Sequence, residues 1–86
     1  MNGQMSRRFD ERYPTDLAAQ ITAMENQELS ASGHVSDLSK SGVCLRTTLQ
    51  FSSGDQVRLE MAESILYGSV AYSTMEGTLF RTGIEV

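Results

Sequence analysis

Val57-Arg58-Leu59-Glu60-Met61 is the segment of this chain that most clearly decides its fold. Apolar and charged side chains alternate at every position. This is the period-two pattern of a β-strand with one buried face and one exposed face. The segment therefore predicts a strand, and the runs on both sides of it show related patterns.

Further β-rich runs recur along the chain at intervals of roughly ten residues. Residues 65–73 and 78–86 follow the central segment and are joined through Glu76-Gly77. Residues 29–36 and 43–47 precede it, and Gly33 in the first of these indicates a bulge or a close approach of two backbones. Residues 51–55 are typical of a turn.

Residues 15–24 fit two descriptions. Leu17, Ala19, Ile21 and Ala23 fall on one side of a strand with a small-residue face. Helix is the alternative, because Ala, Gln, Met and Glu are good helix formers. We favour the strand. With the other runs it predicts an all-β domain, either a small six-stranded antiparallel β-barrel or a small sandwich, of which we favour the barrel.

The composition limits the classes of function. The chain has 86 residues, 40% of them hydrophobic, so one domain with one modest core is expected. No apolar run approaches the roughly 20 residues of a membrane span, and no signal peptide is visible. The single cysteine has no partner for an internal disulfide, so we expect a reducing cytoplasm. The net charge of −4 argues against binding a nucleic acid polymer, which requires a basic face.

The charge is unevenly distributed. Residues 1–12 hold three arginines against two acids, for a local charge of +1, whereas residues 13–86 carry −5. We expect residues 1–14 to form a flexible N-terminal arm before a barrel of residues 15–86. Within it, residues 6–13 can form one or two helical turns closed off by Pro14, which would place Arg8 and Arg12 on one face. Such a patch suits a small defined anion.

A second polar segment, Asp37-Leu38-Ser39-Lys40-Ser41-Gly42, interrupts the strands where a plain hairpin would need only a two-residue turn. Arginine donates hydrogen bonds in pairs to phosphate and to the O6/N7 edge of guanine. The carboxylate of Asp37 can accept from the Watson–Crick N–H donors of guanine. Ser39 can add a phosphate contact, and Gly42 allows either a close approach or a positive φ.

The two segments resemble the signature of the PilZ domains, a family that binds cyclic di-GMP. Its first motif, Arg-x-x-x-Arg, matches Arg8-Phe9-Asp10-Glu11-Arg12, and its second, Asp/Asn-x-Ser-x-x-Gly, matches residues 37–42. The flanks at 12–17, 33–36, 68–70 and 81–86 also look like the family, so the resemblance covers about residues 7–86. It implies a β-barrel. The C-terminal helix that often follows in the family is not expected here.

The resemblance also implies site residues. Arg8 and Arg12 would grip phosphate and guanine, while Asp37 and Ser39 would hold the base and backbone and Gly42 would shape the turn. Arg7 stands where the family often has another arginine, which favours two intercalated molecules of cyclic di-GMP per chain. No catalytic grouping, metal site or cofactor is expected. The implied role is a cytoplasmic bacterial receptor whose arm orders on binding and signals to an unknown downstream protein.

Plainer interpretations stand beside these. The arginines can be a solvated tail, and Asp37 and Ser39 can simply cap a turn. A PilZ-like barrel that binds no nucleotide and serves as a protein-interaction module is the main alternative function. An oligonucleotide-binding barrel is a weaker one, because the chain is acidic and lacks interleaved aromatic residues.

The remaining polar and aromatic candidates have structural interpretations. His34 lacks metal-ligand partners at suitable spacing, so a surface or packing role is expected. Cys44 lies between two apolar residues, which indicates a buried or half-buried thiol. Tyr13, Tyr67 and Tyr72 are expected to pack in the barrel.

Overall fold

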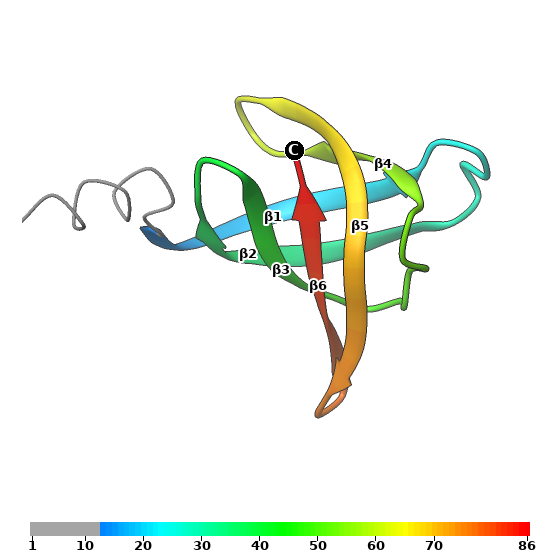
Figure 1. Cartoon of the computed structure of the whole chain (residues 1–86). Helices are drawn as coiled ribbons and strands as arrows, with labels where there is room; N and C mark the ends of the chain where they lie inside the picture. The colour runs from blue at the N-terminus through cyan, green and yellow to red at the C-terminus, as the bar shows by residue number, and fades with distance from the viewer. Residues whose placement is uncertain (1–12) are drawn as a thin grey trace, which may run out of the picture.

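The computed structural model describes residues 13–86, and the regular elements in this range are six β-strands. They are β1 (Tyr13–Ala23), β2 (Ser30–Leu38), β3 (Gly42–Thr47), β4 (Gln56–Glu60), β5 (Ile65–Glu76) and β6 (Leu79–Glu85). Each neighbouring pair is antiparallel, and the sheet closes in the order β1-β2-β3-β6-β5-β4 (Figure 1). The predicted six-stranded antiparallel barrel is confirmed. The sandwich, and the helical alternative for residues 15–24, are wrong.

Strand β1 begins at Tyr13, two residues earlier than the sequence suggested. Its pairing with β2 is irregular between Pro14 and Leu17, a position that tolerates a proline without an N–H group. Beyond the irregularity, the expected alternation holds and Ile21 is fully buried. Leu17 is the exception, because 45% of it is exposed. The helical turns predicted for residues 6–13 lie outside the described residues, except at Tyr13, which belongs to the strand.

The barrel interior is filled by side chains from all six strands and from one loop. Strands β3 and β4 supply alternate positions, as the pattern at Val57 and Leu59 predicts. Phe51 lies in a loop, where a turn was predicted, but its side chain is only 3% exposed. The core consists of Ala19, Ile21, Ala23, Ala31, Val35, Val43, Leu45, Phe51, Val57, Leu59, Val70 and Ile84.

A cluster of buried hydroxyls joins β3, β5 and β6. Thr47 Oγ1 lies 3.1 Å from Thr82 Oγ1, and Ser73 Oγ lies 2.9 Å from the same atom. The backbone N–H of Phe51 donates to Ser73 Oγ at 3.2 Å, which attaches the loop to β5. Because each hydroxyl has a partner, the cluster avoids the cost of burying an unpaired polar group.

Gly33 marks a close approach of two strands. A Cβ at this position would lie 2.7 Å from the carbonyl oxygen of Arg46 on β3. The close approach predicted from the sequence is confirmed, whereas the register irregularity of β2 lies between Val35 and Asp37. A glycine at position 33 therefore serves the close approach of the two backbones and not a bulge.

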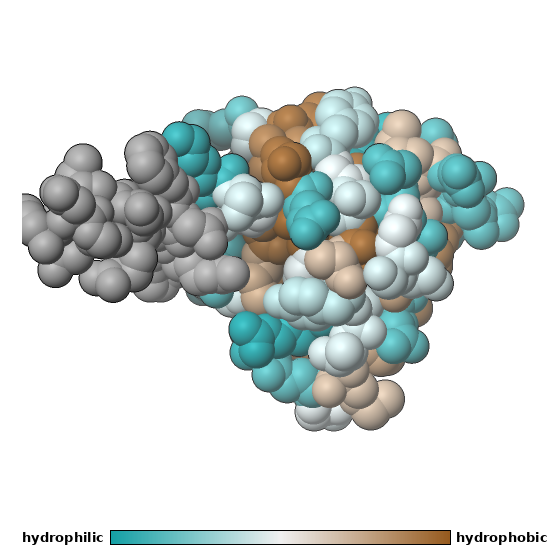
Figure 2. All heavy atoms as spheres, viewed as in Figure 1, coloured by the Kyte–Doolittle hydropathy of each residue, from teal (hydrophilic) through white to brown (hydrophobic). Residues whose placement is uncertain are grey.

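The surface of the barrel is mixed. On the face shown in Figure 2, apolar surface gathers near the end of the chain, where Val86 is 58% exposed. No helix long and apolar enough to cross a membrane occurs among residues 13–86.

Candidate functional site

The chain turns from β2 into β3 through Ser39-Lys40-Ser41-Gly42. The Ser39 N–H donates to the Gly42 carbonyl at 2.9 Å, and the Gly42 N–H donates to the Ser39 carbonyl at 3.4 Å. The hydroxyl of Ser39 also donates to the Gly42 carbonyl, at 3.3 Å. Only Lys40 and Ser41 are left at the tip, so this is a two-residue hairpin. The expectation that the polar segment interrupts the strands with a longer loop was wrong.

The first residues of the polar segment belong to a strand. Asp37 and Leu38 are the last two residues of β2 and pair with Cys44 and Val43 on β3. Leu38 packs against the core, so the alternation of the strand puts Asp37 on the outer face of the barrel.

Gly42 lies where β3 passes closest to β6. A Cβ there would be 2.5 Å from the carbonyl oxygen of Ile84. Positive φ angles within residues 13–86 occur at Gly54 and Gly77, so the positive φ considered for Gly42 is not present. The residue is needed for close strand contact, one of the two roles that the sequence left open.

One row of residues crosses the outer face of four strands. Asp37 on β2 pairs with Cys44 on β3, and Cys44 pairs with Gly83 on β6. Gly83 in turn pairs with Tyr72 on β5, just after an irregularity in that strand. Antiparallel pairing holds such neighbours about 5 Å apart, so the row forms one continuous surface.

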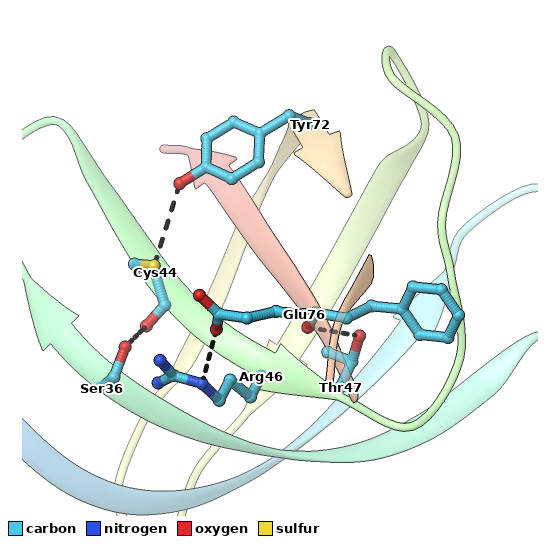
Figure 3. Close-up of polar contacts among 7 residues, drawn as sticks. Ser36, Cys44, Arg46, Thr47, Tyr72 and Glu76 are labelled. Atoms are coloured by element: carbon cyan, nitrogen blue, oxygen red, sulfur yellow. Dashed lines mark hydrogen bonds and ion pairs between the residues drawn. The ribbon is translucent and has the colours of Figure 1, made fainter. Parts of the chain in front are cut away.

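The side chain of Tyr72 covers this row from above. Its ring lies against the backbone of Gly83, and its hydroxyl is 3.8 Å from Cys44 Sγ (Figure 3). Cys44 is consequently only 3% exposed although it faces outward, so the prediction of a buried thiol is confirmed. The expectation that Tyr67 and Tyr72 pack in the barrel was wrong, because they are 59% and 39% exposed. The same expectation for Tyr13 stays a prediction, because the structure describes only the backbone of this residue.

A groove of about 180 Å³ runs between the hairpin turn and Tyr72. The N–H of Val86 donates to the Ser41 carbonyl at 3.1 Å, which fixes the turn beside the end of β6 (Figure 1). Hydroxyl groups at one wall can donate to phosphate or base oxygens, and the aromatic ring at the other can stack on a base. The lining residues are Ser39, Ser41, Gly42, Val43, Cys44, Ala71, Tyr72, Gly83, Ile84 and Glu85.

Most of the positive charge of residues 13–86 lies on this side of the barrel. The range contains four basic side chains: Lys40, Arg46, Arg58 and Arg81. Lys40 is in the hairpin turn, and Arg46 and Arg81 are paired positions on β3 and β6. Arg58 is on β4, which the strand order separates from β3. Three of the four cations thus lie on the side of the groove, together with two acids: Glu85 lines the groove and Glu76 pairs with Arg46.

The two paired arginines have different partners. Arg46 Nε donates to Glu76 Oε1 at 2.9 Å (Figure 3). The pKa of Arg81 is raised above its ordinary value, first by a side-chain hydrogen bond with Cys44 and then by the charges of Cys44 and Tyr72. Arg81 is therefore a permanent cation beside the covered thiol.

The predicted site residues fall into two groups. Ser39 and Gly42 line the groove, and Asp37 lies one strand away in the row that forms its floor. The predicted ligands Arg7, Arg8 and Arg12 lie outside the described residues.

Sequence reasoning missed Tyr72 and Arg81 as neighbours of the site. Gly83 carried the one signal that was available, since a glycine inside a strand often marks a close approach by another group. His34 has the surface role, one of the two that the sequence left open, and its Nδ1 lies 2.9 Å from Asp16 Oδ1. No group of three potential metal ligands occurs among residues 13–86.

Comparison with protein-family models identifies a PilZ domain over residues 6–85. The chain belongs to the PilZ domain family, and the resemblance carried by the two sequence motifs is confirmed. PilZ domains are generally modules that bind cyclic di-GMP, and they form a family of binding and adaptor domains and not of enzymes. A search of curated proteins gave no match.

Proposed function

We propose that this PilZ domain is a receptor for cyclic di-GMP and that the ligand occupies the groove beside the β2–β3 turn. The observation that carries the proposal is the position of Ser39 and Gly42. These residues of the second family motif line a groove whose opposite wall is an exposed aromatic ring. The basic side chains on the same side of the barrel support an anionic ligand.

Each residue has a defined role in this proposal. Arg8 and Arg12 hold phosphate and guanine through paired N–H donors. Asp37 accepts hydrogen bonds from the N–H groups of guanine, and the hydroxyl of Ser39 donates to phosphate. Tyr72 offers a face on which a guanine can stack.

The signal arises at the N-terminal segment. Residues 1–14 close over the bound dinucleotide, and the new surface is recognised by a downstream protein or an attached domain. Arg7 favours a second, intercalated nucleotide. The domain acts by binding and carries out no chemical step, and its free buried thiol suits a cytoplasmic location.

Calorimetric titration with cyclic di-GMP tests the proposal, with GTP and linear pGpG as controls. Saturable binding of cyclic di-GMP, with at least tenfold weaker binding of both controls, is the expected result. Absence of binding, or equal binding of pGpG, would contradict it. Absence would instead support the alternative of a PilZ barrel that serves only as a protein-interaction module.

A further inference from the structure

Arg46 and Arg81 face each other across β3 and β6. Side chains directly opposite in an antiparallel pair are close neighbours, and two like charges in that position destabilise the sheet. Such a pair is stable only where nearby groups or a bound anion balance the charge. The partners of the two arginines therefore show which of them is available to a ligand.

Arg46 is balanced within the barrel. Its Nε donates to Glu76 Oε1 at 2.9 Å, and Glu76 is on β5, on the same outer face (Figure 3). Arg81 differs, because among residues 13–86 no carboxylate forms an ion pair with it. The largest cause of its raised pKa is a side-chain hydrogen bond with Cys44, next to Tyr72. The charge of Glu76 also raises the pKa of Arg81, but it is the smallest of the causes, and the Glu76 carboxylate forms its ion pair with Arg46.

Arg81 is also close to the groove. It precedes Gly83 by two residues on the same face of β6, which is about 7 Å along a strand. Gly83, Cys44 and Tyr72 all line the groove, and Arg81 has a side-chain hydrogen bond with Cys44. Arg81 is not a lining residue itself, so its position is beside the groove, on the strand that carries Gly83.

We propose that Arg81 is a further ligand-binding residue of this site and that it contacts a phosphodiester oxygen of cyclic di-GMP. The inference rests on the proposed function and deepens it. Because the hydrogen bond with Cys44 already orients the guanidinium, its planar fork loses less freedom when it meets the phosphate. Arg46, which is held by Glu76, does not take this role.

The test compares two substitutions that remove the same charge. Arg81→Gln removes it beside the groove, and Arg58→Gln removes it on β4. Cyclic di-GMP is titrated calorimetrically into both variants and the unmodified protein at low and moderate salt, with thermal melting to check the fold. Arg81→Gln is expected to weaken binding about tenfold to a hundredfold and to reduce its salt dependence. Arg58→Gln is expected to change affinity less than about threefold.

Arg81→Lys is the second variant. It keeps a charge but not the paired donors, so its affinity should fall between those of the unmodified protein and Arg81→Gln. If Arg81→Gln has a clearly lower melting temperature than the unmodified protein, the affinity of Arg81→Lys is used to test the assignment. The Arg81 assignment is overturned if every Arg81 variant that folds binds cyclic di-GMP as tightly as Arg58→Gln does. That result would leave the proposed receptor function intact. If the unmodified protein does not bind cyclic di-GMP, the proposed function fails, and this inference fails with it.

Discussion

The ring of Tyr72 lies so close to the backbone of Gly83 that a side chain at position 83 would occupy the same space. The contact keeps the ring flat on the outside of the barrel. It also covers Cys44, which pairs with Gly83 on the next strand. One glycine therefore controls both the aromatic wall of the groove and access to the only cysteine of the chain.

Gly83→Ala should open this cover without unfolding the domain. The new methyl group meets the far end of the half-exposed Tyr72 side chain, which can move aside. We expect the free energy of unfolding to change by less than about 1 kcal/mol. The Cys44 thiol should react much faster with an alkylating reagent, as followed by mass spectrometry. Tyr72→Phe is the control, since it keeps the ring and should keep the thiol slow. Equal rates in Gly83→Ala and the unmodified protein would show that Tyr72 is not the cover.

Gly42→Ala should behave differently. Its methyl group would meet the Ile84 carbonyl oxygen, which is backbone and cannot rotate away. Separation of β3 from β6 should cost about 1–3 kcal/mol, measured by urea unfolding. Gly83→Ala adds the same group to the same face and serves as the matched comparison. If Gly42→Ala is as stable as the unmodified protein but binds cyclic di-GMP poorly, Gly42 contacts the ligand and its structural role is minor.

Arg8→Ala and Arg12→Ala test the first family motif. A charge-assisted contact from each arginine contributes roughly 1.5–3 kcal/mol, so each variant should bind cyclic di-GMP about tenfold to a hundredfold more weakly. Calorimetry gives the affinity, and a melting curve close to that of the unmodified protein shows that the fold is kept. Unchanged affinity in either variant would remove that arginine from the site.

Asp37 should matter more for the base than for the charge of the ligand. Asp37→Ala is expected to lower affinity for cyclic di-GMP and to reduce discrimination against cyclic di-AMP, since a carboxylate accepts from guanine N–H groups. Asp37→Asn is the sharper comparison, because the family motif admits Asn at this position. Normal binding by the Asn variant, together with unfolding of the Ala variant, would make Asp37 a structural residue only.

Arg7 should set the number of ligands. We expect two molecules of cyclic di-GMP per chain in the unmodified protein and a shift towards one in Arg7→Leu, measured as calorimetric stoichiometry. Four phosphate charges on an acidic domain should also make binding weaken with added salt. The amides of residues 1–12 should gain protection from hydrogen exchange when the ligand is added. Saturation of the unmodified protein at one ligand would contradict the Arg7 assignment, and unchanged protection would contradict closure of the N-terminal segment.

The strands could be predicted because their signals are local. Val57 and Leu59 alternate with charged residues, and both are buried in β4. The same alternation at Ile21 overrode the helix propensity of its neighbours, because burial in a barrel stabilises a segment more than intrinsic preference does. Ser39 and Gly42 of the second motif line the groove, and their role in binding stays a prediction.

Other features depend on contacts between distant strands and gave no local signal. From the sequence alone, Thr47 and Thr82 would be expected on the surface, because they are polar. They are buried because β3 and β6 lie side by side and their hydroxyls are hydrogen-bonded to each other. The sequence predicts that Tyr72 packs in the barrel. Only the strand register shows that its ring lies on the outside, against Gly83. The sequence does not distinguish Arg81 from other surface arginines, because its position opposite Arg46 depends on the register of β3 and β6.

The pairing of β3 with β6 has a consequence for the amount of folded protein. These strands are separated along the chain by β4 and β5, so the surface between them exists only after the intervening chain has folded. A ligand that recognises this surface binds the native state and not the unfolded chain, and it raises the free energy of unfolding of the whole barrel by mass action. The concentration of the ligand in a cell would then set the lifetime of the domain against proteases as well as its occupancy.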